Sequence, residues 1–246
     1  MAKDIQPTIE SIEKIFREEY QDRALSSVDT PMVIFVTGVS GSGKSTMIKN
    51  INGFLPNRFR IQPDNYRKLH PKLNQYIKEP GRDHAHKKTG NFSHRFARGL
   101  LDISIKKRVN VIYESTFGNI ETARSLIEPF KNAGYTVLVI QLPVDMRLSI
   151  ERNLRRYEEK KEDMHTLPRM VAKDDIERMA NNYLQNLNTL KEEGINIYTF
   201  DGKEDIHRFV EKSIRTAQFR QRNQAIKPSP DSGVNEKITP TFKLKI

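Results

Sequence analysis

Short apolar runs alternate along the chain with longer segments in which apolar residues recur at helical spacing. The apolar runs predict strands at residues 32–36, 58–62, 109–113, 135–140 and 195–200. The helical pattern predicts helices at residues 8–25, 44–51, 92–107, 120–133, 144–161, 173–193 and 205–219. Strands that alternate with helices in this way favour an α/β fold, with a parallel sheet of about five strands covered by helices on both faces.

Directly after the first apolar run, residues 38–45 have the sequence Gly-Val-Ser-Gly-Ser-Gly-Lys-Ser. This is the G-x-x-x-x-G-K-[ST] pattern of a phosphate-binding loop (P-loop), and it lies between a predicted strand and a predicted helix as such a loop must. Lys44 can reach the β- and γ-phosphates, and the Ser45 hydroxyl offers a ligand to Mg²⁺. We therefore expect ATP or GTP, with Mg²⁺, bound by Gly38, Val39, Ser40, Gly41, Ser42, Gly43, Lys44, Ser45 and Thr46.

Two carboxylates follow other predicted strands, at the sheet edge where parallel strands meet a ligand crevice. Asp64 follows the second strand and is the best-placed base for an attacking hydroxyl, and it is also a candidate metal ligand with Ser45. Glu114 ends the third strand, where it can hold Mg²⁺ through water or bind a substrate hydroxyl. The alternatives are a turn or helix-cap role for Asp64 and a locally satisfied carboxylate at Glu114.

Arginines on the predicted helix 144–161 and shortly after it suit a helical lid, because a planar guanidinium can grip two phosphoryl oxygens at once. The candidates are Arg152, Arg155, Arg156 and Arg169. For each of them, a solvated helix face is the alternative. His84 and His86 do not indicate a metal site, because two histidines at i and i+2 have no third ligand nearby.

Composition narrows the class of protein and its expected partners. The 246 residues contain no cysteine, which excludes disulfides, thiolate metal sites and a cysteine nucleophile. No apolar run approaches the roughly 18 residues of a membrane span, and the N-terminal residues have no apolar signal core, so we expect a cytoplasmic protein. The net charge of +11 can attract nucleotides, nucleic acid or acidic partner proteins. Nucleic acid is the less favoured partner, because no aromatic residues are interleaved with the basic C-terminal residues.

The pattern divides the chain into three parts. Residues 1–29 carry an N-terminal helix that either packs on the sheet or docks a partner, residues 30–220 form the phosphate-binding domain, and residues 221–246 are a basic tail with little regular structure. Within the domain, residues 68–90 are irregular and rich in Lys, His, Pro and Gly. A connection of that length predicts a substrate-binding insert.

Residues 31–200 also resemble the zeta toxin family of P-loop kinases. The resemblance rests first on residues 64–71, Asp-Asn-Tyr-Arg-Lys-Leu-His-Pro, which are similar to the family's Asp-x-Phe-Arg-x-x-His-Pro. Residues 92–95 resemble its Tyr-Ser-Asn-Arg, residues 112–116 its Ile-Glu-Gly-Thr, and residues 156–158 its Arg-Tyr-Glu. The resemblance implies that Lys44, Asp64, Arg156 and Arg169 are catalytic, with Asp64 as the base and the two arginines on the γ-phosphoryl. It implies that Glu114, Thr116, Arg67 and Arg95 bind the substrate.

The better-known members of that family phosphorylate UDP-N-acetylglucosamine and its relatives. The resemblance therefore implies transfer of a phosphoryl group to a nucleotide-sugar hydroxyl, by a toxin that has an antitoxin protein as its partner. Two departures leave the acceptor open: Gly118 stands where the family commonly has a substrate-holding arginine, and Gln62 replaces the first Asp of its Asp-x-Asp. Lys106, Arg95 or Asn119 are the candidates to replace that arginine. The alternatives are a kinase of another small metabolite or of a nucleic-acid 5′ end, and a binding protein that uses nucleotide hydrolysis as a switch.

Overall fold

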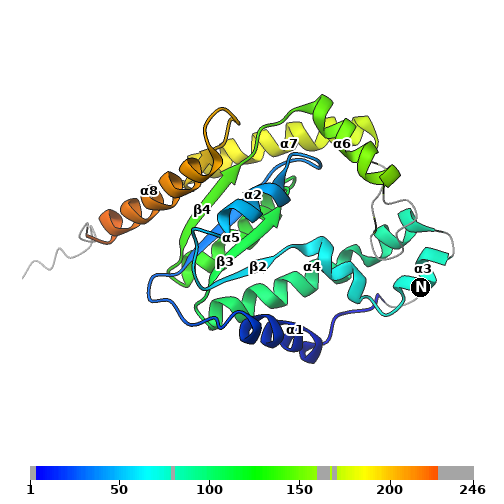
Figure 1. Ribbon diagram of the computed structural model, residues 1–246, viewed down its shortest axis with the longest axis horizontal. Helices are drawn as coiled ribbons and strands as arrows, with labels where there is room; N and C mark the ends of the chain where they lie inside the picture. The colour runs from blue at the N-terminus through cyan, green and yellow to red at the C-terminus, as the bar shows by residue number, and fades with distance from the viewer. Residues whose placement is uncertain (1–3, 79–80, 160–166, 168–170, 227–246) are drawn as a thin grey trace, which may run out of the picture.

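The structure is a computed structural model that describes residues 4–78, 81–159, 167 and 171–226, and it is built around one parallel sheet (Figure 1). The strands of this sheet lie in the order β2-β3-β1-β4-β5. They are β1 (Met32–Thr37), β2 (Arg58–Ile61), β3 (Asn110–Ser115), β4 (Thr136–Gln141) and β5 (Ile197–Thr199). The predicted fold class is confirmed: each predicted apolar run forms a strand, and every strand pairing is parallel.

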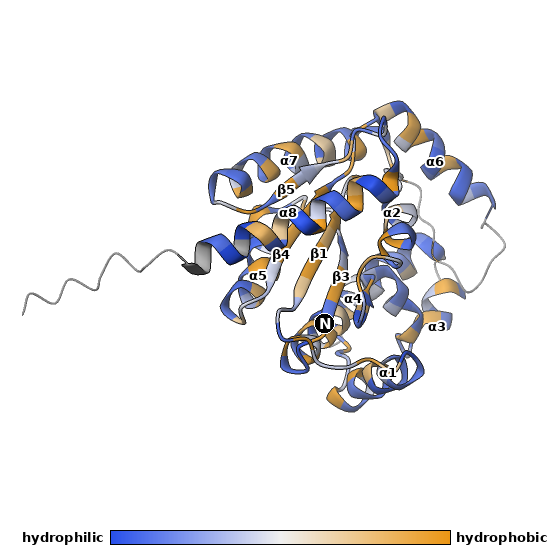
Figure 2. Ribbon diagram, turned by 60° about the vertical axis from the view of Figure 1, so that its left-hand side comes forward, coloured by the Kyte–Doolittle hydropathy of each residue, from blue (hydrophilic) through white to orange (hydrophobic). Residues whose placement is uncertain are grey.

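Helices cover both faces of the sheet, so its central strands are buried on both sides. The helices are α1 (Ile9–Asp22), α2 (Lys44–Ile51), the 3-10 helix η1 (Pro63–Leu69), α3 (Leu73–Lys78), α4 (Arg82–Lys106), α5 (Ile120–Asn132), α6 (Met146–Glu159), α7 (Lys173–Glu192) and α8 (Ile206–Ile226). Helices α1, α4, α5 and α7 pack on one face, and α2 and α8 pack on the other. Figure 2 shows the central strands as largely hydrophobic, whereas the helices carry hydrophobic and polar stripes.

The N-terminal helix packs against the rest of the fold. Thr8 caps α1, because its hydroxyl accepts a hydrogen bond from the Ser11 backbone N–H at 3.2 Å. Ile12 and Phe16 belong to the same buried cluster as the sheet residues of that face. The apolar stripe of α1 is therefore used inside the protein, as the first of the two alternatives expected.

The segment expected to be irregular between residues 68 and 90 is largely helical, so that expectation was wrong. Helix α3 lies within it, and α4 begins at Arg82 rather than at Phe92. The buried positions of the first turns of α4 are Ala85 and Thr89, which are too small or too polar to give a hydrophobic period. The first turns of α4 are therefore held by packing against the rest of the protein, and the hydrophobic pattern of the sequence does not predict them.

The last helix also differs from its expected length. Helix α8 continues to Ile226 instead of ending at Phe219, through a polar stretch that has no apolar stripe. Residues 227–246, most of the expected basic tail, lie outside the described residues, and the three-part division of the chain stays a prediction. In the part of the chain that the structure describes, no helix combines the length and apolar character that crossing a membrane requires.

The strand register brings three chain segments to one edge of the sheet. Val36 of β1 is level with Glu114 of β3, and Ile61, the last residue of β2, is level with Tyr113. Residues that follow β1 and β2 therefore meet the end of β3 at the carboxyl edge, where open α/β sheets bind ligands.

Candidate active site

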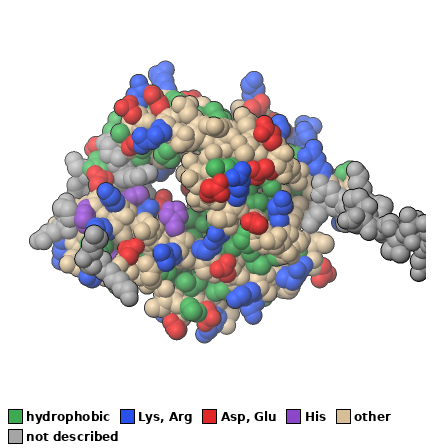
Figure 3. Space-filling view, turned by 180° about the vertical axis from the view of Figure 1, so that it is seen from behind, with side chains coloured by type: hydrophobic (Ala, Val, Ile, Leu, Met, Phe, Trp, Pro, Cys, Tyr) green, Lys and Arg blue, Asp and Glu red, His purple; other side chains and the backbone are tan. Residues whose placement is uncertain are grey.

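A large cleft of about 1500 Å³ opens at this carboxyl edge. Its walls come from the P-loop and the start of α2, from η1, from the residues after β3, and from α6. In the view from behind, histidine side chains gather beside a hollow in the surface (Figure 3). His86 and His94, both from α4, are among the lining residues.

The P-loop connects β1 to α2 in the conformation that its sequence predicts. Gly41 and Gly43 have φ values of +81° and +96°, in the left-handed region that favours glycine, and α2 begins at Lys44. Ser45 and Thr46 are exposed and line the cleft, so their hydroxyls are accessible to a ligand. Val39 differs, because its side chain lies in the core and only its backbone belongs to the loop.

The Lys44 side chain folds back onto the P-loop. Its Nζ donates hydrogen bonds to the carbonyl oxygens of Gly38 (3.0 Å) and Val39 (2.9 Å). Burial lowers the pKa of Lys44; the positive charge of Arg156 lowers it further, and the carboxylate of Glu114 raises it. A phosphate at the loop would give the ammonium a charged acceptor in place of two neutral ones.

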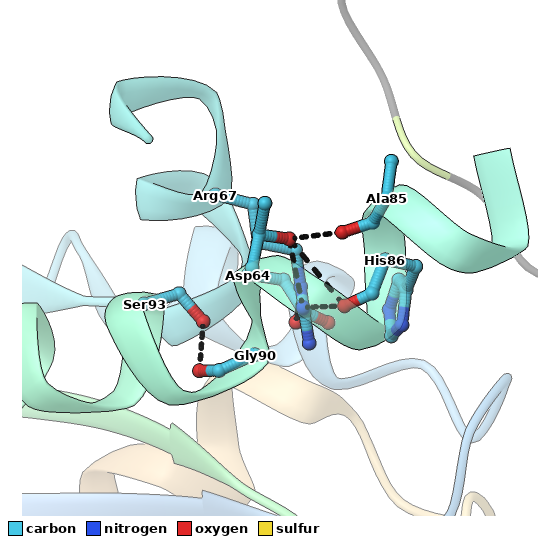
Figure 4. Close-up of polar contacts among 7 residues, drawn as sticks. Asp64, Arg67, Ala85, His86, Gly90 and Ser93 are labelled. Atoms are coloured by element: carbon cyan, nitrogen blue, oxygen red, sulfur yellow. Dashed lines mark hydrogen bonds and ion pairs between the residues drawn. The ribbon is translucent and has the colours of Figure 1, made fainter. Parts of the chain in front are cut away.

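Asp64 and Arg67 form an ion pair on η1, which is separated from the end of β2 by Gln62 alone. Arg67 Nε donates to Asp64 Oδ1 at 2.7 Å, and its Nη1 donates to the His86 carbonyl at 2.6 Å and to Thr89 Oγ1 at 3.3 Å (Figure 4). The Arg67 side chain is only 8% exposed, whereas that of Asp64 is 76% exposed. A buried, multiply bonded arginine thus holds an accessible carboxylate in the cleft.

This pairing changes the acidity of Asp64. Burial by the cleft walls raises the pKa of the carboxyl, but the charge of Arg67 and its hydrogen bond, with His86 and His94, outweigh that effect. The pKa of Asp64 therefore lies below the usual range, and the group is an ionised acceptor at neutral pH. Burial also lowers the pKa of His94.

Gln62 and Glu114 meet between the ends of β2 and β3. Gln62 Nε2 donates a hydrogen bond to Glu114 Oε2 at 2.7 Å, and both residues line the cleft. The neutral amide of Gln62 thus lies where the family pattern has a carboxylate. Its bond leaves the other oxygen of Glu114 for a ligand.

The segment after β3 contains the departure at Gly118. Thr116 is exposed in the cleft, and Phe117 is buried with a φ of +46° and packs on Phe35. Asn119 caps α5 by accepting the Thr122 backbone N–H at 2.8 Å. A Cβ atom at Gly118 would meet only Thr116 Oγ1, at 3.6 Å, so this position has room for a side chain.

Helix α6 forms part of the cleft wall and carries the expected arginines. Arg152, Arg155 and Arg156 all line the cleft, whereas Arg169 lies outside the described residues. Asn153, which the sequence patterns did not single out, also lines it and accepts a hydrogen bond from Ser40 Oγ at 2.7 Å.

Of the expected site residues, Arg95 is placed apart from the others. It is exposed on α4 and is not among the lining residues of the cleft, so a part in substrate binding stays a prediction. Of the three proposed substitutes for the missing arginine, Asn119 lines the cleft, whereas Lys106 and Arg95 are not among its lining residues.

The donor atoms around the loop fit a hard cation such as Mg²⁺. Ser45 offers a hydroxyl, and Asp64 and Glu114 offer carboxylate oxygens, all in the cleft wall. Within the described ranges, no three His, Asp or Glu side chains are grouped so that they could hold a metal ion. Mg²⁺ at such a site takes its remaining ligands from nucleotide phosphates and water.

Comparisons with known proteins agree with this arrangement. The family model described as zeta toxin matches residues 17–225. A solved structure from the PezAT chromosomal toxin-antitoxin system of Streptococcus pneumoniae is similar with a TM-score of 0.65 and 21% identity, covering 89% of this chain and 97% of that one. A putative kinase from Chloroflexus aurantiacus is similar with a TM-score of 0.55 and 17% identity, covering 77% and 99%. A search of curated proteins found no match. With its P-loop kinase fold and a family match over most of its length, the chain belongs to the zeta toxin family.

Proposed function

We propose that the protein is a kinase that transfers the γ-phosphoryl group of ATP or GTP to a hydroxyl of a nucleotide-sugar such as UDP-N-acetylglucosamine. The observation that carries this proposal is the placement of an ionised, accessible Asp64 in the same cleft as the P-loop. A P-loop alone is equally suited to hydrolysis or switching. A carboxylate held by Arg67 beside the loop supplies what transfer to a hydroxyl needs in addition.

In the proposed reaction, the loop amides and Lys44 hold the nucleotide phosphates. Ser45 would hold Mg²⁺, which would supply positive charge beside the phosphates. The acceptor oxygen forms a bond to the γ-phosphorus while the bond to the β–γ bridging oxygen breaks, which releases the nucleoside diphosphate. Asp64 accepts the proton of the acceptor hydroxyl. Arg156, with Arg169, stabilises the transferring phosphoryl group, and Glu114 and Thr116 orient the acceptor.

The zeta toxin family and the toxin-antitoxin system named for the similar structure support a toxin role and an antitoxin partner. We propose that the protein acts in the cytoplasm on a nucleotide-sugar pool. Gly118 favours a second candidate, a kinase of another small hydroxyl compound, because the position that would hold the sugar nucleotide has no side chain.

The test follows the label from γ-labelled ATP or GTP. Purified protein is incubated with the nucleotide, Mg²⁺ and a cell metabolite extract, and products are identified by mass spectrometry, with Asp64→Asn as the control. We expect label on a UDP-amino sugar, no transfer by Asp64→Asn, and nearly unchanged nucleotide affinity in that variant. Label on another small molecule or an RNA end would keep the kinase but replace the acceptor. Release only as free phosphate, equally by both proteins, would favour a switch.

A further inference from the structure

Helix α6 is attached to the P-loop by two side-chain hydrogen bonds. Arg152 Nη1 donates to the Gly41 carbonyl at 3.0 Å, and Ser40 Oγ donates to Asn153 Oδ1 at 2.7 Å. These bonds join residues more than a hundred positions apart in the chain. On the loop side, both bonds are made by residues 40 and 41, within the segment that is expected to bind phosphate.

The contact between loop and helix is close enough to exclude a side chain. A Cβ atom at Gly41 would lie 2.9 Å from the Ser149 carbonyl oxygen and 3.2 Å from Asn153 Nδ2. Asn153 is only 5% exposed, and its Nδ2 donates to the same Ser149 carbonyl at 2.7 Å. Both ends of its amide are therefore bonded, which fixes α6 at one distance from the loop.

Arg152 differs from its neighbours on α6 in where its guanidinium lies. Its Nη1 would be 3.8 Å from a Cβ atom placed on Gly43, so the group reaches across residues 41–43 of the loop. It is half-buried, whereas Arg155 and Arg156 are exposed. Within the described residues, the Arg152 guanidinium donates a hydrogen bond to the Gly41 carbonyl. A guanidinium has five N–H donors, so Arg152 can donate to a bound phosphate as well.

We propose that Arg152 binds the nucleotide phosphates as a second cation of the loop, beside Lys44, and that Asn153 is the positioning residue that keeps it there. A phosphate oxygen is a charged acceptor and outcompetes a neutral carbonyl for an arginine. Arg156 lies four residues further on the same helix, so it faces the cleft from the next turn. With α6 held at this distance from the loop, Arg156 stays on the cleft side from which it would reach the γ-phosphoryl. The inference rests on the proposed function only in requiring that a nucleotide enters the loop.

Calorimetry on the full chain tests the phosphate contact. The ligands are ATP or GTP, whichever the wild-type protein binds more tightly, and the matching monophosphate, with Mg²⁺. The variants are Arg152→Gln and, as a control, Arg147→Gln, which removes the same charge from an exposed position of α6 outside the cleft wall. We expect Arg152→Gln to weaken triphosphate binding about tenfold to hundredfold and monophosphate binding much less. Arg152→Lys, which keeps the charge, recovers part of the loss.

Equal triphosphate affinity in Arg152→Gln and Arg147→Gln would overturn the phosphate contact. An equal loss for both ligands would also overturn it, because a purely structural role would not distinguish them. If the wild-type protein binds no nucleotide at all, the result would instead contradict the proposed function.

Hydrogen exchange tests the positioning role of Asn153 separately. Nucleotide should slow amide exchange in residues 146–159 of the wild-type protein, since a phosphate bound by Arg152 and the loop adds to the bonds that already hold α6 there. We expect Ser40→Ala, which removes the hydroxyl that Asn153 accepts, to lose most of this slowing, and Ser40→Thr to retain it. Identical slowing in Ser40→Ala and wild type would overturn the positioning role.

Discussion

Gln62 donates a 2.7 Å hydrogen bond to the carboxylate of Glu114, and this bond ties the end of β2 to the end of β3. Two carboxylates at this distance would repel each other unless a proton or a cation lay between them. The amide removes that requirement, so this edge of the cleft can be ordered before any metal or nucleotide binds.

Gln62→Glu should therefore make the stability of the protein depend on pH and on Mg²⁺. The new carboxylate would lie beside the carboxylate of Glu114 and repel it when both are ionised, so the destabilisation is smaller at low pH and grows as pH rises. We expect a loss of about 1–2 kcal/mol at pH 8 without Mg²⁺, partly restored by millimolar Mg²⁺. Thermal unfolding at several pH values measures this. Gln62→Met, which is neutral and similar in size, should show no such pH dependence.

Arg67 is the residue through which the acidity of Asp64 can be tested. Arg67→Gln removes both the charge and the hydrogen bond that lower the pKa of Asp64, so this pKa should rise. The acid limb of the kcat/KM profile, where Asp64 takes up a proton, should then move to higher pH. An acid limb that stays in place would show that another group controls it.

The same variant should also lose stability. Because its folded pKa is lowered, Asp64 contributes stability that is fully present above its unfolded pKa, near 3.8, and is lost as pH falls through the folded pKa. Arg67→Gln loses this contribution and the bonds to His86 and Thr89, for which we expect about 1–3 kcal/mol at pH 7. Denaturant unfolding at pH 7 and pH 3 measures both effects. The difference from wild type should shrink at pH 3.

The parts of the site that local rules specify could be predicted from the sequence. The P-loop is a continuous motif with its own glycine geometry, and Asp64 and Glu114 follow from the rule that parallel strands end at one edge. The structure brings all three to the same cleft. Family resemblance added Arg67 and singled out Arg156 among the arginines already expected on the lid helix, and both line the cleft.

The remaining contacts depend on register and helix phase, which no local pattern encodes. The Gln62–Glu114 bond needs the β2–β3 pairing, and the Ser40–Asn153 bond needs the packing of α6 on the loop. Arg95 was expected in the site from a motif match, but its place on the exposed side of α4 follows from the burial of Phe96 beside it. The sequence therefore shows that these residues are present but not which way their side chains face.

Gly41 should tolerate no side chain. An alanine there would have to adopt a φ of +81° and would place its Cβ 2.9 Å from the Ser149 carbonyl oxygen. We expect Gly41→Ala to lower the free energy of unfolding by about 1–3 kcal/mol and to weaken nucleotide binding, because α6 must move away from the loop. Gly53→Ala is the matched control, since a Cβ atom there meets nothing within 4 Å and needs no left-handed backbone. Thermal unfolding and nucleotide titration of the two variants give the comparison.

At Gly118, a substitution should strengthen substrate binding instead of weakening it. A Cβ atom at this position meets only Thr116 Oγ1, at 3.6 Å, and the backbone is not left-handed, so Gly118→Arg should unfold at nearly the wild-type temperature. The family commonly carries its substrate-holding arginine at this position. If the acceptor is a nucleotide-sugar, the new guanidinium should lower the KM for UDP-N-acetylglucosamine about tenfold, the effect of one charged hydrogen bond, with kcat little changed. Gly118→Gln, which adds length without charge, should lower it much less. A stable Gly118→Arg protein with an unchanged or higher KM would instead indicate that the cleft is shaped for a different acceptor.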